Sequence, residues 1–253
     1  MWTEVILRSG KRSAQRTLLE YWAFIATDPC NMHHGRPNSW QRVLAFFAGL
    51  LVLKVTVSVV LKYRDYFPPN FGADFLLGRE PYFFRGYQWA FYVHIASGPI
   101  ALILGLMLVS ERFRRRFPKW HRRLGRIQVL GVLFLVAPSG LWMAYYAQAG
   151  PIAGAGFAAL AIATGICVAL GWRSAVNSRF ADHRRWMWRG FLLLCSAVVI
   201  RVIGGLATVT GVYFAWLDPL AAWASWLAPL AIFEANQTKH RRIGSSPARA
   251  DYL

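Results

Sequence analysis

Residues 88–109 read QWAFYVHIASGPIALILGLMLV, an apolar run in which His94 is the only charged or imidazole side chain. A helix of this length, rising about 1.5 Å per residue, is long enough to cross a hydrocarbon core of about 30 Å. Comparable runs occur on both sides of it. The sequence therefore predicts an all-α fold, a polytopic transmembrane helix bundle with about six spans. The expected spans are residues 43–61, 88–109, 127–147, 152–172, 187–213 and 219–235.

The composition of the whole chain agrees with this class. Of the 253 residues, 56% are hydrophobic and only 16% are charged, whereas about 25% are charged in an average soluble domain. The formal net charge is +18, from 29 Lys and Arg against 11 Asp and Glu. The basic residues stand between the apolar runs and form no continuous stripe, which argues against a nucleic-acid partner.

The positions of the basic residues predict the orientation of the chain. Segments 1–42, 111–126, 173–189 and 236–253 hold 23 of the 29 Lys and Arg, and the opposite side holds four. By the positive-inside rule the richer side is cytoplasmic, which puts both termini in the cytoplasm. This basic face implies anionic lipid headgroups as partners. We expect a multi-pass protein of a bacterial inner membrane.

Three regions are expected along the chain. Residues 1–42 form a cytoplasmic segment with a short interfacial helix at residues 17–26, residues 43–235 form the transmembrane domain, and residues 236–253 form a flexible cytoplasmic tail. The stretch Cys30-Asn31-Met32-His33-His34 holds ligand types that suit copper or zinc. A polar loop is the preferred interpretation, and no metal site is predicted.

Four ionisable side chains lie inside expected spans, namely Lys54, His94, Arg201 and Glu234. Such groups are costly in hydrocarbon, so each is a candidate for handling a ligand or a proton. His94 and Arg201 lie at nearly the same depth in the outer half and could meet. Lys54 lies near the midplane and Glu234 toward the cytoplasmic end. A direct ion pair between them would have to bridge this difference in depth. The alternative is that the long side chains reach the headgroups and His94 bonds a backbone carbonyl.

Two segments on the cytoplasmic side share a His-Arg-Arg motif at the start of an outward-running span. They are His121-Arg122-Arg123 and His183-Arg184-Arg185. A helix N-terminus and arginines together suit an anion, such as a lipid phosphate, a haem propionate or a phosphorylated ligand. The alternative is interfacial docking on headgroups with tryptophan anchors. The cofactor-binding candidates are His121, His183, Arg122, Arg184 and Arg185.

Histidine spacing limits the kind of haem site. A stacked two-haem bundle needs a second histidine 13 or 14 residues further along the same helix, and none follows His94, His121 or His183 at that distance. A single b-type haem ligated by His121 and His183 stays open, as does a quinone. Asp182 or Glu234 would then be a further ligand or a supporting group.

The combined motifs resemble DUF family 2306, a family of membrane proteins. The resemblance covers about residues 88–234. It rests on His94 with Gly98 and Gly105, on the segments 121–126 and 183–189, on Arg201, and on Trp226 with Glu234. It implies a membrane bundle and names no reaction. The His-Arg-x-Leu-Gly-Arg element is also similar to the start of the haem helix in ferric-reductase-like proteins.

The sequence shows no Walker loop, no Gly-x-Ser-x-Gly and no dinucleotide fingerprint, so whether the protein is an enzyme stays open. The leading hypothesis is a membrane redox protein that binds one b-type haem or a quinone. The alternatives are a small-solute or lipid transporter, and an assembly or structural subunit that pairs with a partner membrane subunit or forms a homo-oligomer.

Overall fold

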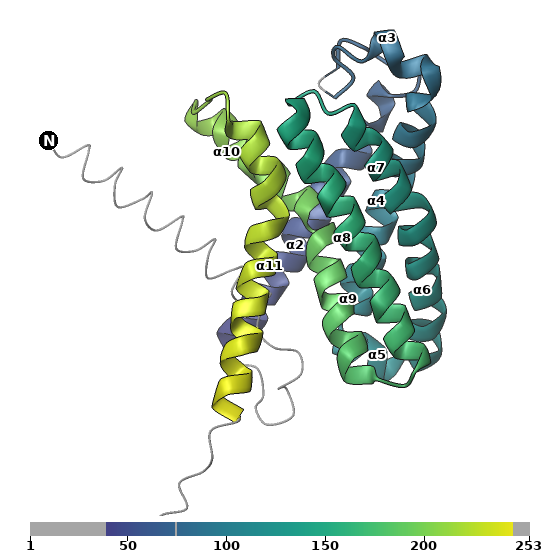
Figure 1. Cartoon of the computed structure of the whole chain (residues 1–253), viewed down its shortest axis with the longest axis vertical. Coiled ribbons are helices and arrows are strands. Elements are labelled where there is room, and N and C mark those ends of the chain that lie inside the picture. Colours follow the sequence, from purple (N-terminus) through teal and green to yellow (C-terminus); the bar gives the residue numbers. More distant parts are fainter. Residues whose placement is uncertain (1–38, 74, 245–253) are drawn as a thin grey trace, which may run out of the picture. The chain divides into compact units, whose positions relative to one another are not determined.

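The computed structural model describes residues 39–73 and 75–244, which are mostly helical (Figure 1). Outside the helices, these residues form one isolated β-bridge, between Tyr66 and Pro69. The all-α fold class is confirmed. The interfacial helix expected at residues 17–26, the ligand-type residues 30–34 and the end of the tail lie outside the described residues.

Among the described residues, five helical segments are long and apolar enough to cross a membrane. They coincide with the first five expected spans, so the chain is a multi-pass membrane protein. In chain order they are α2 (Ser39–Leu61), α4 (Gln88–Leu108), the run of α6 (Pro118–Gly131), η3 (Val132–Val136) and α7 (Ala137–Tyr145), then α8 (Gly150–Val176), and the pair α9 (Phe180–Leu194) and α10 (Ser196–Thr210).

The sixth expected span, residues 219–235, lies within α11 (Leu217–Gly244). It is helical, but its tryptophans, its prolines and the acids Asp218 and Glu234 make it less apolar than the other five. Its passage through the membrane stays a prediction. The remaining helices are short: η1 (Lys62–Asp65), α3 (Glu80–Tyr82), η2 (Phe83–Tyr87) and α5 (Glu111–Arg116).

The third and fifth spans begin earlier than the sequence predicts. Their helices start at Pro118 and Phe180 instead of residues 127 and 187. Both His-Arg-Arg motifs are therefore part of a helix, where connecting segments were expected. Arginine is a good helix former, and proline is well tolerated in a first turn. A helix can thus start in the polar interface before its apolar part begins.

The chain divides into two compact units, Gly49–Leu227 and a smaller one formed by Met1–Ala48 with Ala228–Leu253. In the smaller unit, α11 buries Pro229, Phe233 and Gln237. These residues are four apart and so share one helix face. Of the candidate site residues, Glu234 belongs to this smaller unit and the others to the larger one.

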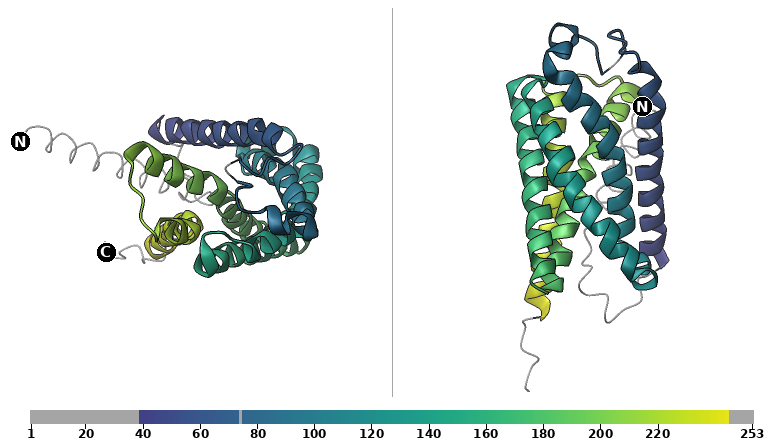
Figure 2. Two further views of the ribbon diagram at one scale, coloured as in Figure 1. Left: turned by 90° about the horizontal axis from the view of Figure 1, so that it is seen from above. Right: turned by 90° about the vertical axis from the view of Figure 1, so that its right-hand side faces the viewer.

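Four spans of the larger unit form a helix bundle. Around the bundle, α4 neighbours the third span, α7 neighbours α8, α8 neighbours α9, and α9 neighbours α4 (Figure 2). The connections at residues 146–149 and 177–179 are short, which makes successive spans antiparallel. The third and fifth spans therefore run in the same direction, stand diagonally opposite, and begin at the same end of the bundle.

Glycines let the helices of this bundle approach closely. A Cβ built on Gly154 of α8 would lie 2.8 Å from the carbonyl oxygen of Ala144 in α7. One built on Gly171 would lie 2.7 Å from the sulfur of Met187 in α9. Small residues at such contacts are the usual device for packing helices in a membrane, where water does not drive helices together.

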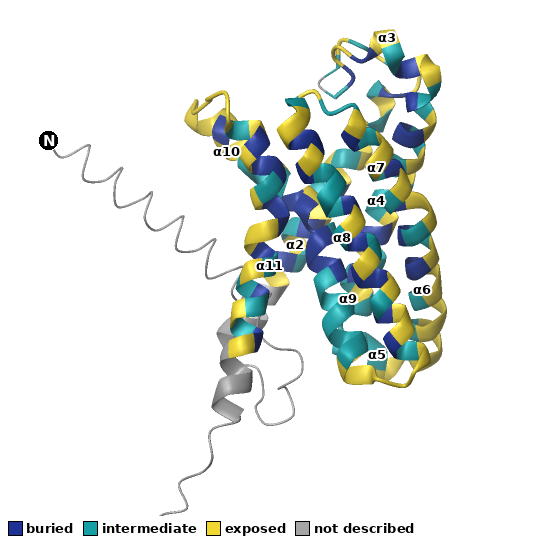
Figure 3. Ribbon diagram, viewed as in Figure 1, coloured by how far each residue is buried: buried dark blue, intermediate teal, exposed yellow. Residues whose placement is uncertain are grey.

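Large apolar side chains remain exposed on the outward faces of α2, α4 and α10 (Figure 3). This is expected when lipid covers those faces. The segment between α2 and α4 instead packs as an aromatic cap whose buried core is Tyr66, Leu76, Phe83, Tyr87 and Phe91. The buried Arg79 lies in this cap, with its guanidinium 4.1 Å from the centre of the Phe75 ring.

Candidate functional site

His121 and His183 occupy equivalent positions in the bundle. Each is the fourth residue of its helix, α6 or α9. Each donates its backbone N–H over 2.9 Å to the carbonyl four residues earlier, that of Phe117 or Arg179. Because α6 and α9 begin at the same end on diagonally opposite sides, the two histidines lie at the same end of the bundle.

The ring of His183 is held by the neighbouring helix. Its Nδ1 lies 2.8 Å from the carbonyl oxygen of Gly171 in α8. A carbonyl can only accept, so Nδ1 carries the hydrogen, and Nε2 keeps its lone pair in the neutral ring. The contact therefore selects one tautomer of His183 and directs Nε2 away from α8.

The hydrogen-bonding groups of the His121 ring are less completely used. Its Nδ1 is buried and has no hydrogen-bond partner among the described residues. The charges of His183, Arg114 and Arg122 act on this ring, so all three lie within electrostatic range of it. His121 therefore lies within electrostatic range of His183 and of two arginines.

The remaining predicted arginines lie at the same end of the bundle. Arg122 is exposed, whereas Arg184 and Arg185 are partly buried. Arg185 reaches Asp182 at 3.9 Å, a long ion pair, and its Nε is buried without a hydrogen-bond partner in the described part of the chain. In the described part of the chain, His, Cys, Asp and Glu do not gather in threes that could hold a metal ion. Asp182 therefore does not complete a three-ligand metal group with the histidines.

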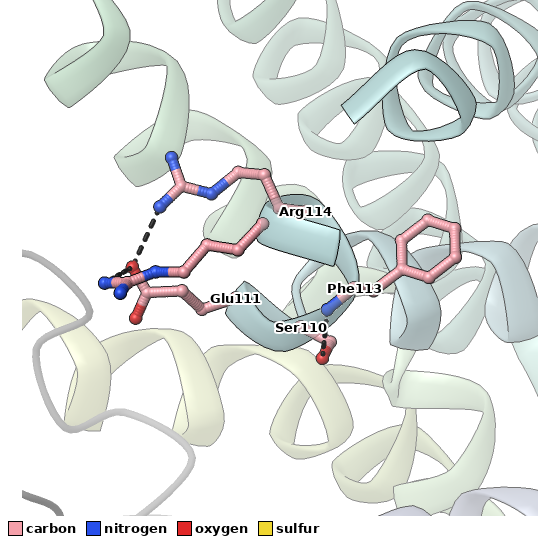
Figure 4. Close-up of polar contacts among 5 residues, drawn as sticks. Ser110, Glu111, Phe113 and Arg114 are labelled. Atoms are coloured by element: carbon pink, nitrogen blue, oxygen red, sulfur yellow. Dashed lines mark hydrogen bonds and ion pairs between the residues drawn. The ribbon is translucent and has the colours of Figure 1, made fainter. Parts of the chain in front are cut away.

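Helix α5 lies between α4 and α6, at this same end of the bundle. Its N-cap, Ser110, accepts a hydrogen bond from the backbone N–H of Phe113 (Figure 4). Glu111 accepts hydrogen bonds from Arg114 at 2.8 Å and from Arg115 at 3.1 Å. Partial burial raises the pKa of Glu111, but the hydrogen bonds and charges of Arg115 and Arg114 outweigh it. The pKa therefore lies below its ordinary value of 4.5.

This lowered pKa predicts an acid-sensitive contribution to stability. The folded state favours ionised Glu111, so the contribution is fully present above pH 4.5 and is lost as the pH falls through the folded-state pKa. Glu111→Gln is expected to lower the thermal midpoint in detergent at pH 7, by an effect of no more than about 1 kcal/mol for such an exposed pair. The difference in thermal midpoint between the variant and wild type should disappear in acid. A gap of equal size at all pH values would contradict this.

His94 lies inside the bundle in the first half of α4. Its Nδ1 is 3.1 Å from the hydroxyl of Ser139, and that hydroxyl donates over 2.5 Å to the Leu135 carbonyl. The hydroxyl hydrogen is thus used, so Nδ1–H of His94 is the donor to Ser139. The ring lies against Gly140, where an added Cβ would be 3.2 Å from the ring carbon Cε1.

Ser139 and Gly140 follow a distorted part of the third span. The N–H of Ala137 donates to the carbonyl of Val132, five residues earlier, which makes η3 a π-helical turn. Pro138 comes next and has no N–H of its own. Such π-turns are common at functional sites. This one immediately precedes the serine and glycine that hold His94.

Arg201 lies in α10 with an exposed side chain. Its Nη1 donates over 2.7 Å to the carbonyl of Ala197. Its charge acts on His94, and it interacts electrostatically with Tyr63 and Tyr66. His94 and Arg201 are thus within electrostatic range, and no hydrogen bond joins them among the described residues.

Tyr63 forms a hydrogen bond with a carbonyl that Pro99 leaves without its helical donor. That proline lacks an N–H, so the carbonyl of Ile95, four residues earlier, loses its helical donor. The hydroxyl of Tyr63 donates to this carbonyl. The contact ties the end of the first span to α4, and Tyr63 lies within electrostatic range of Arg201.

The other two predicted intramembrane residues lie on helices α2 and α11. Lys54 has an exposed side chain on α2. Glu234 is partly buried in α11, in the smaller unit. A direct pair between Lys54 and Glu234 stays a prediction, as do their roles in handling a ligand or a proton.

Sequence reasoning missed Gln128, which is buried within the third span. Its Nε2 donates over 2.9 Å to the carbonyl of Ala101 in α4, and its Oε1 is buried without a partner among the described residues. Gln128 follows His121 by seven residues, about two helical turns, and therefore lies on nearly the same face of the helix. A polar amide inside an apolar run was the available signal, although it carries no charge.

Comparison with known proteins gives the family. The model of the family described as "Predicted membrane protein (DUF2306)" matches residues 91–236. Searches of curated proteins and of solved structures gave no significant match. The matched region runs from α4 into α11 and includes His94, both His-Arg-Arg motifs and Arg201. The chain belongs to the DUF2306 family of membrane proteins.

Proposed function

We propose that the protein is a membrane redox protein that binds one b-type haem between His121 and His183. The observation that carries the proposal is the equivalent placement of the two imidazoles, each on the fourth residue of one of two diagonally opposite, parallel helices. Two histidines at the same end of a helix bundle could supply the imidazole ligands of one haem.

The imidazoles of His121 and His183 are suitable ligands for a haem. Histidines that ligate metals usually donate the other ring N–H to a carbonyl or carboxylate, which orients the ring. The contact of His183 with Gly171 has this form. His121 has a buried ring nitrogen that the described residues leave without a partner.

Space beside His121 also supports the proposal. Gly125 is one helical turn further along α6, on the same face as His121. A Cβ built on Gly125 would meet no atom within 4 Å. The position of a Cβ on Gly125 is therefore unfilled, which favours the approach of a bound group to this face of α6. The charges of Arg114 and Arg122 that act on His121 suit the two carboxylates of such a group.

The chemistry that a bound haem supplies is one-electron transfer at a potential set by its axial ligands. The residues of this chain would orient the imidazoles, neutralise carboxylates with arginine and keep water out with the packed helices. We propose further that this end of the bundle faces the cytoplasm of a bacterial inner membrane, because residues 111–126 and 173–189 hold 13 of the 29 Lys and Arg, whereas residues 62–87 at the opposite end hold four.

An optical spectrum tests the proposal directly. Protein purified in detergent from haem-replete cells is expected to show a Soret band, sharp visible bands on reduction, and about one haem per chain by extraction, as two axial imidazoles require. A colourless preparation from such cells, which does not take up added haem, would overturn the proposal.

A further inference from the structure

A small cavity lies at the junction of α5 and α6, where the third span begins. Its volume is about 330 Å³, and it is lined by Arg116, Phe117, Pro118, Lys119, Trp120 and Arg123. That volume is at the lower end of the range of about 300–1,000 Å³ that is usual for ligand clefts. Because Pro118 is the first residue of a candidate membrane span, the cavity lies at the depth where lipid headgroups meet the apolar core.

Three of the lining side chains are cations without an acidic partner. The side chains of Arg116, Lys119 and Arg123 form no ion pair and no hydrogen bond with the described residues. Glu111 is the only acid in residues 111–126, and the two arginines before Arg116 both donate hydrogen bonds to it. The nearest acid in the chain is therefore already shared, and the cavity keeps an excess of positive charge.

Two exposed aromatic rings hold the arginines of the cavity. The guanidinium carbon of Arg116 is 5.7 Å from the centre of the Phe117 ring, and that of Arg123 is 5.9 Å from the centre of the Trp120 ring. Cations are attracted to ring faces at distances up to about 6 Å. Such a contact uses no hydrogen-bond donor, so the N–H groups of both arginines stay available to a ligand.

An exposed apolar strip continues from the cavity into the span. It consists of Ile127 and Leu130, which follow Arg123 by four and seven residues and so lie on the same face of α6. They are 55% and 56% exposed. A molecule that places an anionic group in the cavity can therefore lay an apolar chain along this strip. This arrangement matches a membrane phospholipid, whereas a soluble anion would have no use for the strip.

The charge of the cavity also selects among phospholipids. The head of phosphatidylglycerol carries one negative charge and no cation. Phosphatidylcholine has the same phosphate, but its head adds a quaternary ammonium, which the three cations of the cavity would repel. Basic residues at the membrane surface attract anionic lipid in this way. The cavity therefore favours a phospholipid whose head is anionic overall.

We propose that the cavity between α5 and α6 binds the head of an anionic phospholipid such as phosphatidylglycerol, with an acyl chain along Ile127 and Leu130. The proposal turns a general attraction between a basic face and anionic lipid into one saturable site with named residues. The site is separate from the His121 and His183 pair. Its occupancy needs no haem, so lipid binding and haem binding can fail independently of each other.

The test uses the delipidated full chain in a neutral detergent, titrated with phosphatidylglycerol and observed by native mass spectrometry, which counts bound lipids. One phosphatidylglycerol per chain is expected at concentrations at which phosphatidylcholine stays unbound. Each cation beside an anionic lipid is worth about fivefold in affinity, so Lys119→Gln combined with Arg123→Gln is expected to weaken binding about 25-fold. Glycerophosphoglycerol, the same head without acyl chains, should not displace the lipid.

The matched control is Arg112→Gln combined with Arg173→Gln. This variant removes two exposed cations from the same end of the bundle, neither of which lines the cavity. It has the same net charge as the site variant and should bind phosphatidylglycerol as wild type does. The comparison of the two lipids uses wild type alone, so a misfolded variant does not block the test.

Three outcomes would overturn the proposal. Equal binding of the two lipids by wild type would show that the cavity does not read headgroup charge. Equal affinity of the two double variants for phosphatidylglycerol would show that the lining cations form no particular site. Displacement of the lipid by glycerophosphoglycerol would assign the cavity to a soluble phosphodiester.

Discussion

His183→Ala is expected to abolish the Soret band of the purified protein, and His121→Ala is expected to do the same. The physical reason is that a haem held between two helices loses one of its two axial bonds in either variant. For His183 the hydrogen bond to Gly171 that orients the ring is lost as well. The measurement is the reduced-minus-oxidised spectrum at equal protein concentration, together with the haem content per chain.

The control for this pair is Lys119→Ala. Lys119 is exposed in the first turn of α6, two residues before His121, and the variant should keep the full band. The variant His121→Gly, supplied with imidazole in the buffer, should regain a Soret band, because the free ligand fills the space left by the side chain. An alanine variant with an undiminished band would refute ligation by that histidine.

Gly154→Ala is expected to destabilise the bundle much more than Gly165→Ala, although both lie on α8. At Gly154 the added carbon would lie 2.8 Å from the backbone oxygen of Ala144, which a side-chain movement cannot relieve. At Gly165 the nearest atoms would be 3.9 Å and 4.0 Å away, an ordinary contact. Overpacking of this kind typically costs about 1–3 kcal/mol.

The measurement is the thermal midpoint of the detergent-solubilised protein, followed by the fraction that stays monodisperse after heating. Gly165→Ala should match wild type or exceed it slightly, because alanine is the better helix former. If both variants have the same thermal midpoint, close contact between α7 and α8 at Gly154 is not a determinant of stability.

The membrane-spanning helices follow from local sequence. An apolar run that crosses hydrocarbon must bond its own backbone, and a single helix does so without partners. This is why the expected spans agree with α4 almost to the residue, and why the family resemblance drawn from residues 88–234 is confirmed by the match to residues 91–236. The early starts at Pro118 and Phe180 were missed because hydropathy detects apolar residues, whereas helix formation also continues through arginine.

The candidate sites depend on which helices are neighbours, and the sequence motifs do not specify this. The His-Arg-Arg motifs are visible in the chain, but their common end of the bundle follows from the order of α4, the third span, α8 and α9. The partners of His94 come from a π-turn and a serine that are 45 positions away in the chain. Gln128 was not predicted as a site residue, because its amide carries no charge.

The sequence by itself determined that this protein is a helical membrane bundle of the DUF2306 family, because apolar length and basic flanks act locally along the chain. Only the tertiary structure decided that His183 is oriented by Gly171, that Ser139 holds His94, and that Arg201 acts on His94 and Tyr63. The first two are hydrogen bonds and the third is an electrostatic interaction, and each joins residues from different helices. Glycines and Pro99 permit close packing and free a carbonyl, but they do not specify which residue of another helix becomes the partner.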